Sequence, residues 1–180
     1  MTMWNPGEDT RPPLKVCGLL RSCSILEHAP GAAVAPLRLV VVGAVVKPLV
    51  DLLIPGERAV LNADWAQTGP AESLHLAALA LPEGTPWALV TPVDVPPCSA
   101  DDLTRLCAAA TPAVLSHQGL PGHPARLGPH ELAALRRAPP AGGLRALLTG
   151  ATLIPSAHPD ALLNLNTPEE LAAWRRGDHR

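Results

Sequence analysis

The sequence predicts an α/β domain with a mostly parallel sheet and helices on both faces. Short apolar runs, typical of strands buried on both faces, alternate along the chain with helical patterns of moderate length. The 180 residues suffice for one domain and are too few for two of ordinary size. With 47% hydrophobic and 17% charged residues, the chain can bury a sizeable core.

Five apolar runs are the predicted strands. The first, Leu39–Val42, is continuously apolar and ends at Gly43, which indicates a strand covered on both faces. The others are short and end at polar residues or proline. They are expected at Arg58–Leu61, Trp87–Val90, Ala113–Leu115 and Thr152–Ile154.

Helices are predicted between these strands and after them. Apolar residues from Leu74 to Leu81 recur at intervals of three and four, which marks one face of a helix. Ser99 and Thr167 are expected N-caps, because a hydroxyl there accepts a hydrogen bond from an amide of the first turn. The remaining helices are expected at Pro48–Ile54, His130–Arg137 and Leu144–Leu148.

Composition limits the classes of function. Residues 1–36 are rich in Pro and Gly and are expected to be irregular, before a domain at 37–176. With no Phe or Tyr and a net charge of −2, the chain lacks the stacking platforms and basic surplus of a nucleic-acid binder. No apolar run has membrane-spanning length and the N-terminus has no apolar signal core, so we expect no membrane partner and a cytoplasmic location. Reduced, mostly buried thiols are expected at Cys17, Cys23, Cys98 and Cys107, which lack C-x-x-C spacing.

Asp94 is the most suggestive candidate for chemistry. Ligands of such sheets bind beyond the carboxyl ends of the strands, and Asp94 follows an apolar strand there. Pro92 and Pro96 hold it in a rigid segment, and no neighbouring Lys or Arg in the sequence neutralises it. Such a carboxylate suits a hard cation such as Mg²⁺. The alternative is an Asp that only caps a turn.

Two further segments carry polar candidates. Asn164 and Asn166 alternate with leucines, so that their amides would point to one side and bind a metal or a phosphate. The alternative is a polar turn before the last helix. Ser73, near a helix start, either caps the helix or contacts a nucleotide. His123, in a predicted Gly-His-Pro loop, either contacts substrate or is an ordinary surface residue.

Five segments in a fixed order carry recognisable patterns: an Asn-x-x-Trp…Ser-Leu stretch, an Asp-x-Pro, a Gly-His-Pro, a Gly-x-Arg and an Asn-x-Asn-Thr-Pro-Glu-Glu-Leu. Together they resemble the MobA-like nucleotidyltransferases, which include the enzymes that attach GMP or CMP to molybdopterin. The resemblance fits from about residue 37 to 175. The segments are Ala59–Leu81, Trp87–Leu106, Pro121–Leu127, Gly142–Leu148 and Leu163–Trp174.

The resemblance implies a Rossmann-like domain of the nucleotide-diphospho-sugar transferase type. Its activity would be Mg²⁺-dependent transfer of a nucleoside monophosphate from GTP or CTP to a phosphate acceptor such as molybdopterin, with release of pyrophosphate. A molybdoenzyme or its chaperone would be a protein partner. Asp94 matches the catalytic carboxylate that binds the metal, and Asn164 and Asn166 match the second polar pair beside it. The other matches are with the nucleotide pocket and the acceptor side, at Asn62, Ser73 and His123.

The N-terminal segment departs from the family pattern. The family opens with a strand and a glycine-rich loop, L-A-A-G-x-G-x-R-M-G-x-x-K, whose amides and cations hold the triphosphate. Here Arg11 and Lys15 would be the remnants of the nucleotide-binding cationic pair, with Lys15 also catalytic, whereas Glu8 and Asp9 would repel phosphate.

Three interpretations therefore stay open. The chain is an active enzyme of molybdenum-cofactor biosynthesis, a catalytically inactive member that binds a nucleotide or a partner protein, or a transferase acting on a sugar phosphate or another small phosphate. An in-frame glycine-rich stretch encoded upstream of Met1 would favour the first. The motifs do not distinguish GTP from CTP.

Overall fold

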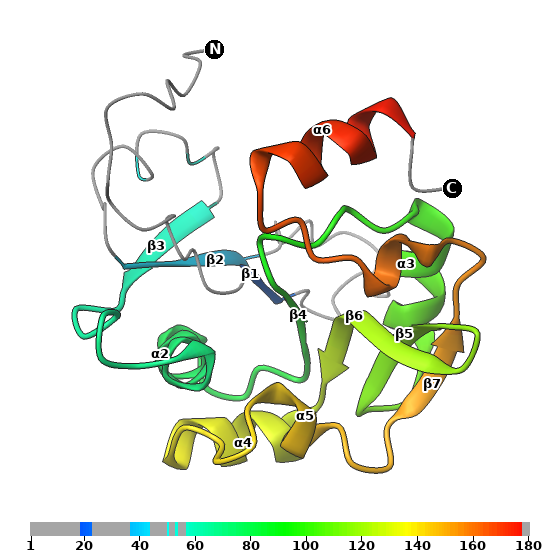
Figure 1. Cartoon of the computed structure of the whole chain (residues 1–180). Helices are drawn as coiled ribbons and strands as arrows, with labels where there is room; N and C mark the ends of the chain where they lie inside the picture. Colours follow the sequence, from blue (N-terminus) through cyan, green and yellow to red (C-terminus); the bar gives the residue numbers. More distant parts are fainter. Residues whose placement is uncertain (1–18, 23–36, 44–49, 51–52, 54–56, 178–180) are drawn as a thin grey trace, which may run out of the picture.

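The computed structural model describes residues 19–22, 37–43, 50, 53 and 57–177 of the chain. Within them, seven strands form one sheet in the order β3-β2-β1-β4-β6-β5-β7 (Figure 1). The strands are β1 (Leu19–Ser22), β2 (Leu37–Val42), β3 (Glu57–Leu61), β4 (Ala88–Thr91), β5 (Ala113–His117), β6 (Leu120–Leu127) and β7 (Thr152–Pro155).

Five of these seven strands run in one direction. β2 is parallel to β3, and β5 is parallel to β7. β1 is antiparallel to β2 and β4, and β6 is antiparallel to β4 and β5. It follows that β2, β3, β4, β5 and β7 share a direction, with β1 and β6 reversed. The predicted α/β fold with a mostly parallel sheet is confirmed.

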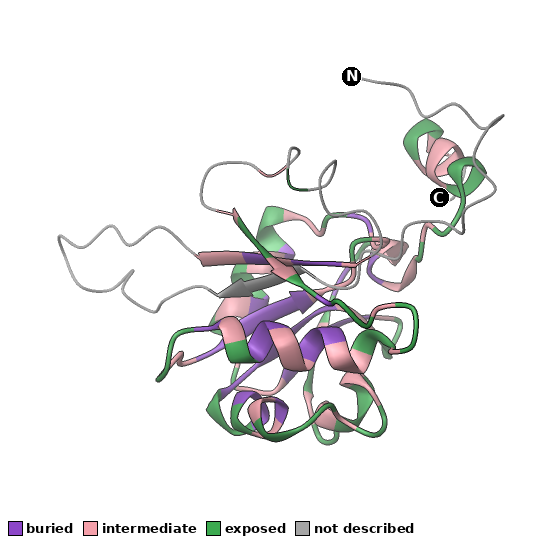
Figure 2. Cartoon of the chain, turned by 90° about the vertical axis from the view of Figure 1, so that its left-hand side faces the viewer, coloured by how far each residue is buried: buried purple, intermediate pink, exposed green. Residues whose placement is uncertain are grey.

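Helices cover both faces of the sheet, as predicted. On one face α2 (Pro70–Ala80) and α4 (Pro129–Arg137) pack in one core cluster with alternate residues of β2 and β4 and with Leu127 of β6, and α5 (Leu144–Leu147) lies against the same cluster. On the other face α3 (Ala100–Ala108) packs through Leu106 on Leu89 and Leu115. Figure 2 shows the buried residues concentrated in the strands and on the inner sides of these helices.

The helix ends follow the capping residues of the sequence. The Ser99 hydroxyl accepts a hydrogen bond of 3.1 Å from the amide of Asp102, at the start of α3. Thr167 caps α6 (Pro168–Arg176) in the same way, and Glu170 completes a capping box by accepting from the amide of Thr167 at 3.0 Å. Both N-caps were predicted, because a hydroxyl satisfies an otherwise unpaired amide of the first turn.

The structure corrects two expectations and adds an element. The prediction of an irregular segment is wrong at Leu19–Ser22, because hydrogen bonds to β2 and β4 on its two sides hold these residues as β1. The predicted Gly-His-Pro loop is instead part of β6, despite two prolines. The turn η2 (Pro159–Leu162) was not predicted. The helix expected at Pro48–Ile54 lies largely outside the described residues.

Two further observations concern the broader expectations. Cys98 and Cys107 are half-buried rather than fully enclosed, while Cys17 and Cys23 lie outside the described residues. No helix in the described part of the chain is long and apolar enough to cross a membrane.

Candidate active site

Most predicted site residues gather at one edge of the sheet. Asn62 and Asp94 follow β3 and β4, at the edge where the five parallel strands end. His123 lies at the same edge, because β6 runs in reverse and begins there. Asn164 and Asn166 follow η2, and a hydrogen bond from Leu165, the residue between them, joins their segment to Asp94 at this edge. Arg11 and Lys15 lie outside the described residues.

The loop after β4 brings Asp94 next to the two predicted amides. The carbonyl oxygen of Asp94 accepts a hydrogen bond of 2.6 Å from the backbone amide of Leu165. Asn164 and Asn166 flank Leu165, and both side chains are exposed, whereas Asp94 is half-buried. Two stretches that are distant in sequence are thus neighbours in the fold.

This donor set fits magnesium. Among the described residues, no three or more His, Cys, Asp and Glu side chains gather in a way that could hold a metal. Asp94 with the amides of Asn164 and Asn166 offers one carboxylate and neutral oxygens. Mg²⁺ is commonly held by one or two carboxylates while it keeps several waters and bridges to substrate phosphates. The set lacks the thiolate and imidazole ligands typical of zinc.

His123 lies in a bulge of β6. The pairing of β5 with β6 shifts between Val114 and Ser116, so that Gly122–Pro124 stand opposite Leu115 alone. β4 does not pair with these three residues either, because its ladder with β6 begins beyond them, at Ala125. Bulges commonly redirect a side chain near a functional site, and this one interrupts the sheet beside Asp94.

The electrostatics of His123 link it to Asp94. Burial lowers the pKa of His123, and the Asp94 carboxylate acts against that shift. The imidazole is therefore neutral at neutral pH. Its Nδ1 is buried and has no hydrogen-bond partner in the described part of the chain. Because Nδ1 is enclosed while the residue as a whole is half-buried, a ligand would have to contact the ring elsewhere than at Nδ1.

Gly122 allows a close contact beside His123. A Cβ atom at this position would lie 2.1 Å from the carbonyl oxygen of Ala161 in η2. Only glycine permits the backbones of β6 and η2 to approach so closely. The contact holds the start of the segment that leads to Leu165.

Asn62 and Ser73 meet inside the protein. The Asn62 amide donates to the hydroxyls of Thr68 at 3.1 Å and of Ser73 at 3.3 Å, and its carbonyl accepts from the amide of Asp64 at 3.2 Å. Asn62 is only 4% exposed and Ser73 only 3%. The structure therefore brings these two predicted nucleotide-binding residues together, as buried supports of the turn between β3 and α2.

The same turn contains a contact that sequence reasoning missed. A Cβ atom on Gly43 would lie 2.7 Å from the Cβ of Trp65, so the indole side chain packs against the backbone at the end of β2. Trp65 is half-buried, and the neighbouring Asp64 is exposed. A glycine directly after an apolar strand was the sequence feature that could have indicated this close approach.

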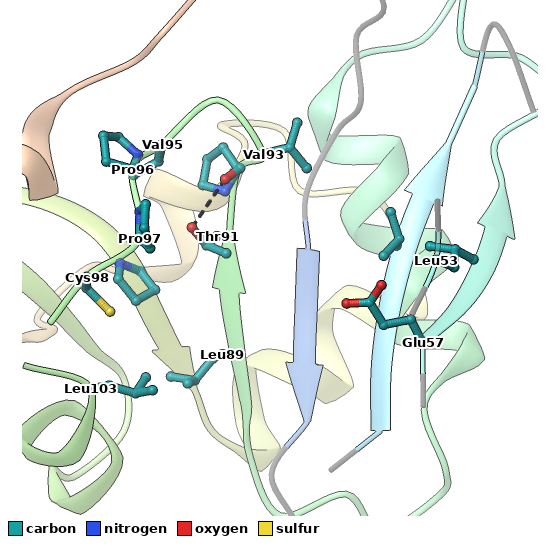
Figure 3. A pocket seen from close by; sticks show the side chains of 13 residues that line it. Leu53, Glu57, Leu89, Thr91, Val93, Val95, Pro96, Pro97, Cys98 and Leu103 are labelled. Carbon is teal, nitrogen blue, oxygen red and sulfur yellow. Dashed lines mark hydrogen bonds between the residues drawn. The ribbon is translucent and has the colours of Figure 1, made fainter. Parts of the chain in front are cut away.

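A cavity of about 390 Å³ lies beside the polar residues, under the loop after β4 (Figure 3). Val93 and Val95, on either side of Asp94, line it, but Asp94 does not. The described lining offers one carboxylate, Glu57, and otherwise consists almost entirely of apolar side chains. Among the described residues, this lining supplies no cation and no amide side chain.

The comparison with protein families decides the classification. A family model described as the MobA-like NTP transferase domain matches residues 19–160. The chain belongs to the MobA-like NTP transferase family. The match runs from β1 to η2 and includes Asp94 and His123, while Asn164 and Asn166 lie just beyond it. Membership supports nucleotidyltransferase activity in general terms.

One solved structure supports the fold. It is the crystal structure of a Mycobacterium tuberculosis rv0371c homolog from Mycobacterium sp. strain JC1. The similarity has a TM-score of 0.62 at 18% sequence identity, and covers 77% of this chain and 73% of the other. At this identity the likeness shows the α/β fold alone. A search of curated proteins finds no significant match.

Proposed function

We propose that this MobA-like protein transfers a nucleoside monophosphate from GTP or CTP to a phosphate acceptor such as molybdopterin and releases pyrophosphate. The observation that carries the proposal is the hydrogen bond from Leu165 to Asp94. It gathers one carboxylate and the neighbouring amides at the sheet edge where His123 also lies. The match to the MobA-like NTP transferase family supports the class of reaction, which is nucleotidyl transfer.

The reaction needs positioning and charge neutralisation more than covalent chemistry. An oxygen of the acceptor phosphate attacks the α-phosphorus, the bond to the β-phosphate oxygen breaks, and pyrophosphate leaves with that electron pair. Asp94, Asn164 and Asn166 would hold Mg²⁺, which when bound neutralises phosphate charge. The neutral imidazole of His123 would hydrogen-bond the acceptor.

The N-terminal cations complete the proposal. Leu19 pairs with Thr91, so β1 begins at the edge of the sheet where β4 ends. Lys15 precedes Leu19 by four residues, which span at most about 14 Å of extended chain. This reach supports a role for Lys15, and with it Arg11, in offsetting the charge of the triphosphate.

A catalytically inactive, nucleotide-binding or partner-binding protein is the second candidate. The N-terminal segment favours it, because it lacks the glycine-rich loop and carries Glu8 and Asp9. The buried state of Asn62 and Ser73 favours the partner-binding form of this candidate, because neither side chain is exposed to a nucleotide.

Turnover and binding measurements separate the two candidates. Pyrophosphate release is measured with GTP, CTP or ATP, in the presence of Mg²⁺ and molybdopterin, and calorimetry records binding of each nucleotide. We expect release with GTP or CTP and its loss in Asp94→Ala. Glu83→Ala, which removes an exposed carboxylate after α2, is the matched control. Binding without release would establish the inactive protein instead.

A further inference from the structure

The two segments that form the proposed metal site are joined at two points. One runs from Asp94 into α3 and the other from Ser156, after β7, through η2 to Leu165. At the site, the amide of Leu165 donates to the carbonyl of Asp94. At the other end, the Ser156 hydroxyl donates a hydrogen bond of 2.8 Å to Oδ2 of Asp102.

Asp102 fixes the start of α3 to the end of β7. Asp102 is only 2% exposed, so its carboxylate requires hydrogen-bond and charge partners inside the protein. The Arg105 guanidinium donates to Oδ1 of Asp102 and, at 2.6 Å, to the carbonyl of Pro155 in β7. The carboxylate thus binds both its own helix and the segment that follows β7.

Ser156 fixes the direction in which the second segment leaves the sheet. Its amide donates to the carbonyl of Ser116 at 2.7 Å, and its own carbonyl lies 3.1 Å from Nδ1 of His117. Its hydroxyl also accepts from the amide of His158 at 3.1 Å. These contacts hold the chain three residues before η2 begins.

The segment beyond Ser156 has little freedom before it reaches the site. η2 is pressed against β6 by the close approach of Gly122 to Ala161. The stretch from Ser156 to Leu165 is therefore held at both of its ends and at η2 between them, which ties the position of Leu165 to that of Ser156.

We propose that Asp102 and Ser156 are positioning residues for the metal site. Their hydrogen bond sets where Asn164 and Asn166 lie relative to Asp94, although Asp102 and Ser156 are not metal ligands themselves. The proposal rests on the proposed function, because it takes Asp94, Asn164 and Asn166 as the Mg²⁺ ligands. Loss of a supporting residue of this kind typically weakens metal binding by about 10–100-fold.

The first test does not involve metal or activity. Hydrogen exchange of the Leu165 amide reports the bond to Asp94, and exchange of the Leu132 amide, bonded to Gly128 within the start of α4, is the internal reference. We expect Ser156→Ala to accelerate exchange at Leu165 by about 10-fold and to leave Leu132 unchanged. Ser116→Ala, which removes a buried hydroxyl from β5, is the matched control. Unchanged exchange at Leu165 would overturn the proposal.

The second test measures binding of Mn²⁺, as a magnetic substitute for Mg²⁺, by electron paramagnetic resonance. We expect about 10-fold weaker binding in Ser156→Ala and recovery in Ser156→Thr, which retains the hydroxyl. Asp102→Asn provides a second variant if Ser156→Ala does not fold. Equal Mn²⁺ affinity in the wild type and the folded variants would overturn the proposal. A wild type that binds no Mn²⁺ would instead overturn the proposed function, while accelerated exchange at Leu165 would still support the positioning role.

Discussion

The backbone amide of Leu165 lies 2.6 Å from the carbonyl oxygen of Asp94 and donates a hydrogen bond to it. The bond joins the loop after β4 to the segment between η2 and α6. It uses main-chain atoms only, which leaves the carboxylate of Asp94 and the amides of Asn164 and Asn166 available to a ligand. The backbone therefore holds the two segments of the candidate site together, and the exposed side chains of Asn164 and Asn166 can be changed with little effect on the fold.

Removal of the two amides tests their role directly. Asn164→Ala and Asn166→Ala are each expected to raise the Mg²⁺ concentration needed for half-maximal pyrophosphate release by about 10-fold. The midpoint of urea unfolding should stay within experimental error, because both side chains are exposed. Gln118→Ala, which removes an exposed amide between β5 and β6, should change neither quantity. An unaltered Mg²⁺ requirement in both variants would exclude the amides as ligands.

The stability of the protein should depend on pH through His123. Burial holds its pKa below the ordinary value of 6.5, so the unfolded chain takes up this proton at a higher pH than the folded protein. The free energy of unfolding should therefore fall as the pH drops below 6.5, and this component should be absent in His123→Asn. Asp94→Asn should steepen the fall, because the Asp94 charge works against the shift. Urea unfolding at a series of pH values measures this free energy. Identical pH profiles of wild type and His123→Asn would contradict the prediction.

Local patterns in the sequence predicted most of the elements. Apolar runs and caps such as Ser99 and Thr167 act within a few residues, so they can be identified without knowledge of the tertiary structure. β1 could not be found this way, because Leu19–Ser22 owes its conformation to hydrogen bonds with β2 and β4. The Gly-His-Pro segment was predicted as a loop, whereas it lies in β6, where a bulge accommodates its proline.

The candidate site was predictable in its residues and not in their roles. The polar residues at the strand ends were identified from position alone, and the fold places Asn62, Asp94 and His123 at one edge. That Asn62 is only 4% exposed depends on Thr68 and Ser73 closing around it, which no spacing rule reveals. Side-chain hydrogen bonds formed only in the folded turn thus decide that Asn62 is enclosed.

The contact between Gly122 and η2 predicts a large difference between two glycine substitutions. A Cβ in Gly122→Ala would lie 2.1 Å from the carbonyl oxygen of Ala161, so backbone must move, at a cost of about 1–3 kcal/mol in the free energy of unfolding. Gly69→Ala meets no atom within 4 Å and should cost less than about 1 kcal/mol, from its position at the start of α2. Urea denaturation compares the two, and equal losses of stability would show that the close approach is relieved without strain.

From the internal position of Asn62 and Ser73, we expect that their side chains support the structure rather than bind the nucleotide directly. Asn62→Ala leaves the amide of Asp64 and the hydroxyls of Thr68 and Ser73 without their partner, and should lower the free energy of unfolding by about 1–3 kcal/mol. Ser73→Ala removes a single hydrogen bond of 3.3 Å and should cost about 1 kcal/mol. In both variants the loss of stability should appear without any nucleotide present, in urea unfolding followed by circular dichroism. A variant of normal stability that binds GTP or CTP at least 10-fold more weakly would instead make the side chain a direct ligand of the nucleotide.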